Sequence, residues 1–409
     1  MQDKIFSMQH LLYLSASFLI ALCISLYSVP VVIRVAKALR LMDNPNERSS
    51  ADNPIPTLGG IAIFLSFVFA STLGLSRHEL PELIYIVVAI ILMFFVGLKD
   101  DILTLPAKKK LMAQLLAAAI IVFLAKIRFT NLHGFLGVGE IGMLSSIVLT
   151  FFVIIVIINA FNLMDGIDGL AAGLSMMAAT VFGIWFFITG HIEFAILCVS
   201  LVGAIAGFFY YNVYGKENKI FMGDTGSLVL GTVMSIIVIH FNELNIDQTT
   251  PYAIASTPAV SFGILIYPLA DTIRVMTIRI FQFKSPFNAD KNHLHHRLLA
   301  LGFSHKKATY TIIATNMLFL IPVFALHHIG VVKLMVFMLI FGGFLFMIPA
   351  IIIHKKKLID RNDPNQQLLI PGSEYRILKS NRNEFKASKL WLGFKTMSLQ
   401  AILQKLNLW

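Results

Sequence analysis

The sequence predicts an all-α polytopic membrane protein, a bundle of about eleven transmembrane helices. Its 409 residues are 57% hydrophobic and only 13% charged, and the mean hydropathy is +0.78, whereas soluble domains carry roughly 25% charged residues. The apolar residues form runs of roughly 20 residues, the length that crosses a bilayer core. These runs lack the period-two alternation that is typical of a membrane β-barrel.

The apolar runs are expected to be helices, because backbone N–H and C=O groups in lipid are satisfied only within a helix or a closed barrel. In chain order they span residues 11–36, 57–76, 81–98, 111–126, 144–161, 168–189, 192–211, 227–242, 254–281, 310–330 and 332–353. The first run is too long for the apolar region of a signal peptide and lacks a clear small-residue cleavage site, so we expect it to be retained. Cys23 and Cys198 fall inside predicted helices, where buried free thiols are expected.

Two domains are expected, a membrane domain of residues 1–354 and a basic cytoplasmic tail of residues 355–409. In the tail, leucine and isoleucine residues recur at helical spacing between lysines from Leu399 to Leu406, with Trp391 and Trp409 nearby. This pattern favours an amphipathic helix at the membrane surface. A contact with a partner and an unstructured end are the alternatives.

The net charge of +11 follows the loops. Basic residues gather after the first, third, seventh and ninth runs: Lys37, Arg40, Arg48, Lys99, Lys108, Lys109, Lys110, Lys216, Lys219, Arg274, Arg279, Lys284, Lys291, Arg297, Lys306 and Lys307. The positive-inside rule places these loops and the C-terminus in the cytoplasm and the N-terminus outside. Because topology accounts for the basic residues, no nucleic-acid partner is inferred.

The dense polar motifs all lie in these loops, although polar groups at a membrane boundary are costly unless they face water, a partner or an ion. They are DNPNERSSADNPIPTLGG (43–60), GLKDDILTLPAKKK (97–110), NAFNLMDGIDGLAAG (159–173), KIFMGDTGSL (219–228) and DKNHLHHRL (290–298). We therefore expect one site in a cleft at the cytoplasmic face. Asp271 and Arg274, spaced i, i+3, form either an internal ion pair or a ligand contact.

Two acidic pairs fall within these motifs. Asp100 and Asp101 end an apolar run, and Asp165 and Asp168 share one helical face at i, i+3. Alone, the first pair is equally well explained as solvated loop carboxylates balanced by the lysines that follow. Two acidic pairs at one face repel each other, and such a cluster is typical of a site for Mg²⁺, which shares oxygen ligands with phosphates.

Two further motifs indicate phosphate chemistry. Asp224 lies in the glycine-flanked turn FMGDTGS before an expected helix, whose first N–H groups can bind an anion. The cluster His293, His295, His296 and Arg297 suits either zinc or phosphate oxygens; phosphate is favoured because no cysteine lies nearby and the spacing is not that of HExxH. The absence of P-loop and Rossmann glycine motifs argues against those nucleotide sites.

Together the five motifs, from Asp43 to Leu298, resemble those of the polyprenyl-phosphate N-acetylhexosamine-1-phosphate transferases, glycosyltransferase family 4. The resemblance implies a bacterial inner-membrane bundle of about ten or eleven helices with a cytoplasmic catalytic cleft. It also implies an Mg²⁺-dependent enzyme, with Mn²⁺ as an alternative cofactor, that moves a sugar 1-phosphate from a UDP-sugar to undecaprenyl phosphate and releases UMP. NLMD and HLHHR look most like the N-acetylglucosamine type, which starts polysaccharides such as O-antigen and teichoic acid.

The resemblance also assigns roles motif by motif. Asp100 matches the base for the lipid phosphate and Asp101 its acidic neighbour, both as catalytic candidates, while Asp224, with Asp165, matches the Mg²⁺ ligands and Phe221 the aromatic residue that stacks on uracil. The nucleotide-side motif corresponds to Asn162, Asp165, Gly166 and Asp168. The histidine motif corresponds to His293, His295, His296 and Arg297, near the pyrophosphate and sugar, with His295 and His296 as catalytic candidates. Lys108 and Lys110 are hypothesised to offset phosphate charge.

Three positions and one segment depart from the family pattern. Thr104 replaces an aspartate, Ala51 a histidine and Thr57 an arginine that many members carry. The segment NVYGKENK before FMGD is about two residues longer than usual, which affects the placement of Asn212 at the ribose.

Several alternatives stay open. The donor could carry another N-acetylhexosamine or N-acetylmuramoyl-pentapeptide, Asp100 or Asp101 could form a covalent phosphoenzyme, and the chain could form a homodimer. A cation-coupled transporter is the non-enzyme alternative. It is disfavoured because the sequence shows no convincing internal repeat and the acidic groups lie at one face of the membrane.

Overall fold

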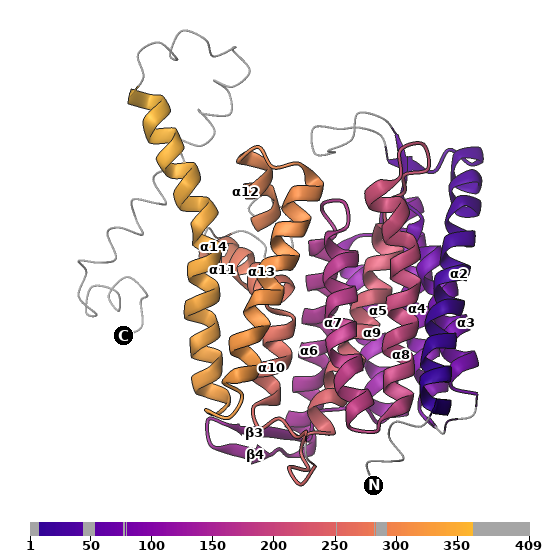
Figure 1. Cartoon of the computed structure of the whole chain (residues 1–409), viewed down its shortest axis with the longest axis vertical. Helices are drawn as coiled ribbons and strands as arrows, with labels where there is room; N and C mark the ends of the chain where they lie inside the picture. The colour runs from indigo at the N-terminus through magenta and orange to yellow at the C-terminus, as the bar shows by residue number, and fades with distance from the viewer. Residues whose placement is uncertain are drawn as a thin grey trace. The chain divides into compact units, whose positions relative to one another are not determined.

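The computed structural model describes residues 8–43, 54–76, 78, 80–250, 252–281, 283 and 293–362, and most of these are helical (Figure 1). The helices are α2 (Met8–Ala38), α3 (Gly59–Gly74), α4 (Leu83–Leu103), α5 (Ala107–Ala119), α6 (Met143–Met164), α7 (Leu170–Ile188), α8 (Ile192–Phe209), α9 (Gly223–Glu243), α10 (Thr257–Ile264), α11 (Ile266–Phe281), α12 (Leu294–Ala300), α13 (His305–Ala325) and α14 (Val331–Asn362). The π-helical turns η1 (Ile120–Leu124) and η2 (Tyr210–Tyr214) continue α5 and α8. Two antiparallel pairs complete the described part, β1 (Met42–Asp43) with β2 (Ile55–Pro56) and β3 (Asn131–Phe135) with β4 (Val138–Glu140).

Eight of the described helices are long and apolar enough to cross a membrane: α2, α4, α6, α7, α8 with η2, α9, α13 and α14 as far as Ile353. A ninth crossing results if α10 and α11, which meet at an 85° bend, count as one span. The prediction of a polytopic helical membrane protein is confirmed, and each predicted segment contains a helix. The number of eleven crossings stays a prediction, because α3 is apolar but has only 16 residues and the helix of the fourth segment begins with three lysines.

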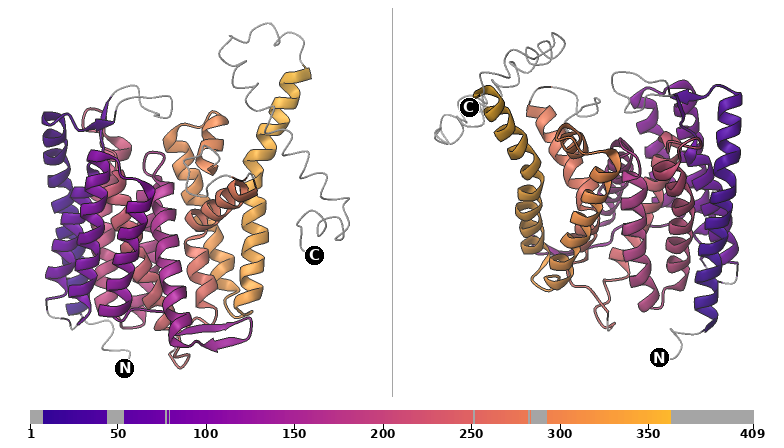
Figure 2. Two further views of the ribbon diagram at one scale, coloured as in Figure 1. Left: turned by 180° about the vertical axis from the view of Figure 1, so that it is seen from behind. Right: turned by 45° about the horizontal axis from the view of Figure 1, so that its top comes forward.

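The central helix is α9, which packs against α3, α4, α6, α7 and α10. Its most apolar stretch is 89% buried, compared with 33% for α2. From two further directions, Figure 2 shows most helices of this bundle running roughly along one axis, whereas α11, bent by 85° from α10, lies across it. Helix α9 is therefore the core element, and its first turn carries Asp224.

Glycines let neighbouring helices approach the first turn of α9 closely. A Cβ atom at Gly60 of α3 would lie 2.1 Å from the backbone nitrogen of Gly226, and one at Gly97 of α4 would lie 2.5 Å from Cα of Thr225. Small residues are the usual means of close helix packing in membranes, where no hydrophobic effect drives helices together. Any larger residue at these positions would push α3 or α4 away from Asp224.

The polar turns meet at one end of the bundle. Helix α4 ends at Leu103 and α6 at Met164, while α7 and α9 begin just after polar turns and α12 begins at Leu294. At the same end, the Nζ atom of Lys37 donates to the carbonyl oxygen of Glu217 at 3.3 Å, so the last turn of α2 lies beside the loop before α9. The β3–β4 hairpin lies at the opposite end (Figure 1).

The structure tests the expectation that both cysteines are buried. Cys198 is buried as expected, but the expectation for Cys23 was wrong: its position on α2 is exposed, because the buried residues Ala21 and Ser25 of that helix face the bundle.

The chain divides into two units after Pro349, within α14, and the domain boundary after residue 354 stays a prediction. Arg48, Ala51 and the tail pattern from Leu399 to Leu406 lie outside the described residues.

Candidate active site

Lys110 joins two carboxylates where α4, α5 and α9 meet. Its Nζ atom lies 2.6 Å from Oδ2 of Asp224 and forms a second ion pair with Asp100. Asp100 is buried and also accepts a hydrogen bond from the backbone N–H of Leu105, in the short turn between α4 and α5. Burial acts to lower the pKa of Lys110, but the charge of Asp224 and the hydrogen bond to Asp100 outweigh it and raise that pKa. Lys110 therefore stays charged as the shared counter-ion.

Asn162, from the last turn of α6, holds the other oxygen of Asp224. Its Nδ2 atom donates to Oδ1 of Asp224 at 2.6 Å and lies 2.9 Å from Oγ of Ser227. Asp224 is thus fixed on both sides by residues from two different helices. This arrangement brings together three of the residues that the sequence assigned to separate motifs.

Asp101 is bound to the first turn of α9. Its Oδ1 atom accepts from the backbone N–H of Asp224 at 2.7 Å, and its Oδ2 atom accepts from the N–H of Thr225 at 3.0 Å and its Oγ1 at 2.5 Å. The first N–H groups of a helix have no partner within the helix, and a carboxylate there is also favoured by the helix dipole. This geometry favours a positioning role for Asp101, as an anchor of the turn that carries Asp224.

Replacing Asp101 with alanine is expected to lower the free energy of unfolding by about 2 kcal/mol, because two N–H groups of α9 lose their acceptor. The measurement is the thermal midpoint in detergent, compared with Asp247→Ala, whose exposed carboxylate accepts, among the described residues, from Thr249 alone. An unchanged midpoint together with lost activity would instead indicate direct participation of Asp101 in the chemistry.

Asp165 lies half-buried among other carboxylates at the end of α6. Burial raises its pKa to about 8, and the charges of Asp224, Asp101 and Asp168 add to the increase, against one backbone hydrogen bond from Gly223. The side chains around Asp165 are therefore mainly acidic and do not stabilise its ionised carboxylate. A cation or a donor group of a ligand would stabilise that carboxylate.

Asp168 is held by two basic residues. Its Oδ2 atom lies 2.6 Å from Nζ of Lys219 and 3.3 Å from Nδ1 of His305. Burial acts to raise the pKa of Asp168, but the neighbouring His305 and Lys219 outweigh it and lower the pKa. Its Oδ1 atom is buried and has no hydrogen-bond partner among the described residues, so one acceptor remains for a ligand. His305 was not among the residues expected from the sequence, and Lys219 was expected only as a basic residue that begins the motif KIFMGDTGSL.

The histidine motif covers the turn between α6 and α7. A Cβ atom at Gly166 would lie 2.5 Å from Nε2 of His295, so the absence of a side chain lets His295 approach the turn. Burial lowers the pKa of His295 to about 3, which leaves its ring neutral. The ring of His296 lies 4.3 Å from that of His295.

Asp271 fixes the start of α12. Its carboxylate accepts from Nδ1 of His293 at 2.8 Å, from Arg274 at 2.6 Å and from the backbone N–H of Leu294 at 3.2 Å. The pair Asp271 and Arg274 is therefore an internal ion pair, one of the two alternatives that the sequence left open. His293 is only 4% exposed, and its contact supports a positioning role. Arg297 lies half-buried in the last turn of α12.

Phe221 and Asn212, two further residues considered from the sequence, make hydrogen bonds that join backbone segments around the site. Phe221 is half-buried, and its N–H and C=O groups bond to Pro56 and Gly59, which attaches the start of α3 to the turn before α9. Asn212 accepts from the N–H of Gly169 at 2.6 Å and donates to the C=O of Ile220 at 2.8 Å. Both polar groups of Asn212 are thus engaged with the backbone.

Lys108 is exposed and lies about 200° around α5 from Lys110, away from the cluster.

The residues of the cluster fit a cation that is held through oxygen atoms. Among the described residues, no three acidic, histidine or cysteine side chains meet as metal ligands. Mg²⁺, however, is usually held by one or two carboxylates plus substrate phosphates, and Asp224 and Asp165 offer such a pair. The acidic surroundings that raise the pKa of Asp165 fit a bound divalent cation.

Comparisons with known proteins agree with this site. The family model described as glycosyl transferase family 4 matches residues 83–242, a range that contains Asp100, Asp101, Asp165, Asp168 and Asp224. A Bacillus subtilis protein named a probable undecaprenyl-phosphate N-acetylglucosaminyl 1-phosphate transferase is 32% identical over 320 residues, which cover 78% of this chain and 86% of the relative. Proteins of Escherichia coli and Salmonella typhi, both named undecaprenyl-phosphate alpha-N-acetylglucosaminyl 1-phosphate transferase, are each 31% identical over 67% of this chain and 73% of the relative. These matches set the transporter alternative aside, and the chain belongs to glycosyl transferase family 4, the polyprenyl-phosphate N-acetylhexosamine-1-phosphate transferases.

Proposed function

We propose that the protein transfers N-acetylglucosamine 1-phosphate from UDP-N-acetylglucosamine to undecaprenyl phosphate. An oxygen of the lipid phosphate attacks the phosphorus next to the sugar, the bond to the uridine phosphate breaks, and UMP leaves. The observation that carries the proposal is the Asp100, Lys110 and Asp224 cluster in a chain whose relatives are named for this transfer.

The cluster suits a reaction between two negatively charged phosphates. Phosphoryl transfer depends mainly on in-line positioning and on fixed charges that stabilise the transition state. Asp224 and Asp165 would hold Mg²⁺, which, when bound, neutralises charge on the diphosphate. Lys110 and Lys219 supply fixed positive charge on the two sides of the cluster. Asp100 accepts the proton of the lipid phosphate, whose second pKa of about 6 makes that proton easy to remove.

We further propose that this end of the bundle faces the cytoplasm of a bacterium. Support comes from the basic residues at this end, including Lys37 in the last turn of α2, Lys110 in the first turn of α5 and Lys219 in the loop before α9, because the positive-inside rule assigns basic ends to the cytoplasm. The product, a sugar linked to the lipid by a diphosphate, would start a cell-envelope polysaccharide.

The test of the function uses purified protein, Mg²⁺ and a panel of UDP-N-acetylhexosamines, with and without undecaprenyl phosphate. UMP release from UDP-N-acetylglucosamine that requires the lipid is the expected result. Faster turnover of UDP-N-acetylgalactosamine or of UDP-N-acetylmuramoyl-pentapeptide would reassign the donor. UMP release that is independent of the lipid would overturn the transfer reaction.

Replacing Lys110 with glutamine is expected to lower kcat between about tenfold and a hundredfold, because Asp100 and Asp224 lose their shared counter-ion and the phosphates lose a fixed cation. Lys108→Gln is the matched control: the same residue type on the same helix, exposed and outside the cluster. It should change kcat less than twofold. Equal losses for both variants in the UMP-release assay would show that only the net charge of the loop matters.

A further inference from the structure

A cavity of about 790 Å³ with charged and apolar side chains in its lining lies at the other end of the bundle from the candidate active site. Its walls come from the first turn of α4, the end of η1 with residues 125–130, the start of α6 and the last turns of α9. Glu82 at the cavity immediately precedes α4 and lies 18 positions before Asp100 at the active site, or about 27 Å along a helix. The cavity is therefore separate from the site of the proposed transfer, and the inference below does not rest on that function.

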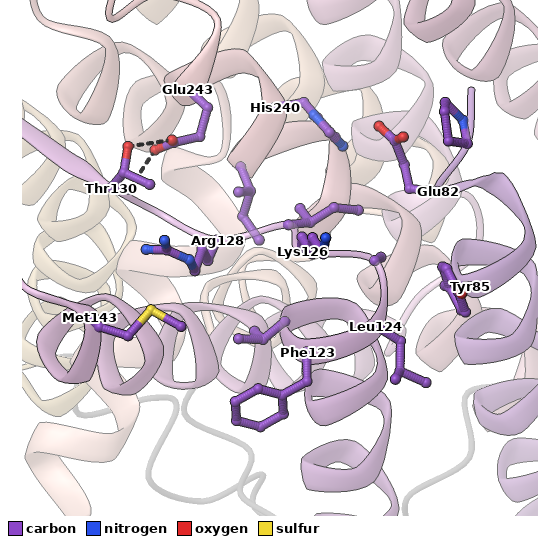
Figure 3. A pocket seen from close by; sticks show the side chains of 15 residues that line it. Glu82, Tyr85, Phe123, Leu124, Lys126, Arg128, Thr130, Met143, His240 and Glu243 are labelled. Carbon is purple, nitrogen blue, oxygen red and sulfur yellow. Dashed lines mark hydrogen bonds between the residues drawn. The ribbon is translucent and has the colours of Figure 1, made fainter. Parts of the chain in front are cut away.

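The cavity contains two acidic and two basic side chains, Glu82, Glu243, Lys126 and Arg128. Within the part of the chain that the structure describes, no ion pair joins any of the four. In Figure 3, Glu82 and Arg128 lie on opposite sides of the cavity, with Lys126 between them. The cavity thus presents separated charges of both signs.

Two of these charges already have neutral partners. Glu243 accepts from the N–H of Thr130 at 2.8 Å and from its Oγ1 at 2.7 Å, and Arg128 donates from one terminal nitrogen to Oγ of Ser146 at 2.8 Å. These contacts fix the two side chains while leaving the remaining donors of Arg128 available. Among the described residues, Lys126 and Glu82 have no side-chain hydrogen bond or ion pair.

The backbone around Lys126 is unusual. The preceding turn η1 is a π-helix, a form often found at functional sites. Lys126 itself has a φ of 58°, in the left-handed region that side chains other than glycine rarely adopt. Such conformations cost roughly 1–3 kcal/mol and persist where the surrounding structure imposes them. Here the turn directs the chain across the cavity and places Lys126 and Arg128 on its wall.

Apolar side chains border the cavity. Phe123 and Leu124 are each 53% exposed and Met143 is 56% exposed, although all three also line the cavity. In a membrane-spanning chain such residues face acyl chains, and lysine, arginine and tyrosine near them reach the head-group layer. A ligand that suits both surfaces is an amphiphile, with its head group in the cavity and its chains along Phe123 and Leu124.

We propose that this cavity binds the head group of a zwitterionic phospholipid with a primary ammonium group, the chemistry of phosphatidylethanolamine. Lys126 and Arg128 bind its phosphate, and Glu82 binds its ammonium group, which lies a few ångströms further along the head group. An anionic head group would place negative charge beside Glu82 without a partner for it. A zwitterion satisfies all three side chains at once.

The experiment is native mass spectrometry of the purified full-length protein, titrated in detergent with phosphatidylethanolamine, phosphatidylcholine and phosphatidylglycerol of identical chains. The wild type is expected to retain phosphatidylethanolamine in preference to the other two. Lys126→Gln should lower that occupancy about fivefold or more, whereas Lys126→Arg keeps it. Glu82→Gln should remove the preference over phosphatidylcholine, whose ammonium group has no N–H donor. Lys333→Gln, an exposed lysine on α14 outside the cavity, is the matched control and should leave occupancy unchanged.

Three results would overturn the proposal. Equal occupancy in the wild type and in Lys126→Gln, with both proteins showing the same thermal midpoint, would indicate annular lipid only. A preference for phosphatidylglycerol would contradict the zwitterionic ligand. Displacement of the lipid by an equal concentration of soluble phosphoethanolamine would show that the cavity takes a free anion. Misfolding of Lys126→Gln leaves the comparison of Glu82→Gln with the wild type as the deciding test.

Discussion

Replacing Asp224 with asparagine is expected to lower kcat about a thousandfold, one of the two largest effects expected at this site. Asparagine keeps the shape of the side chain and an oxygen for Asn162, but it removes the charge that pairs with Lys110 and that would hold Mg²⁺ with Asp165. Activity of the wild type should vanish with EDTA and return with Mg²⁺. The Mg²⁺ concentration for half-maximal rate should rise in the variant.

A binding measurement separates metal loss from misfolding. Mn²⁺ is a spectroscopic probe for the same oxygen ligands, and its electron paramagnetic resonance signal should show binding to the wild type with UDP-N-acetylglucosamine and weak binding to Asp224→Asn. Asp247→Asn, an exposed carboxylate in the loop after α9, is the control and should behave as the wild type. Equal Mn²⁺ affinity in both variants would place the metal elsewhere.

Replacing Asp100 with asparagine is expected to lower kcat between about a hundredfold and ten thousandfold, the range that general-base catalysis supplies. Asp100 is buried, accepts from the N–H of Leu105 and pairs with Lys110, so its carboxylate is held in one position. The loss should be smaller at high pH, because more of the lipid phosphate is then already deprotonated and no base is needed.

A pH profile of the UMP-release rate for Asp100→Asn and the wild type measures this rescue. A variant that keeps the wild-type kcat at saturating Mg²⁺ would remove Asp100 from the role of base. A phosphoenzyme trapped with labelled donor would favour the covalent alternative, in which the β-phosphate passes through Asp100 or Asp101.

The helical class and the position of the site followed from sequence because long apolar runs and the polar turns between them are local patterns. Asp100, Asp165 and Asp224 lie far apart in the chain, yet each ends or begins a predicted helix at the same face. Helices that cross in alternate directions bring such turns together without further information. For that reason the sequence predicts that these three aspartates lie near one another. It does not predict which side chains contact each other.

The roles of individual side chains could be assigned only from the three-dimensional structure. Asp100 and Asp101 are adjacent in sequence, but neighbours on a helix point about 100° apart, so one faces Lys110 and the other faces the first turn of α9. His305 reaches Asp168 because the first turn of α13 lies beside the start of α7. Nothing in the sequence around His305 indicates this contact. Lys108 and Lys110 look equivalent in the sequence, and only the orientation of α5 distinguishes them.

The most direct test of the proposed transfer is the fate of the β-phosphate of UDP-N-acetylglucosamine, labelled with ³²P at that phosphorus. Incubation of purified protein with the labelled donor, Mg²⁺ and undecaprenyl phosphate should move all of the label into the lipid fraction, with one unlabelled UMP released per lipid product. Label that leaves in UDP, with only the sugar on the lipid, would contradict the transfer of a sugar 1-phosphate.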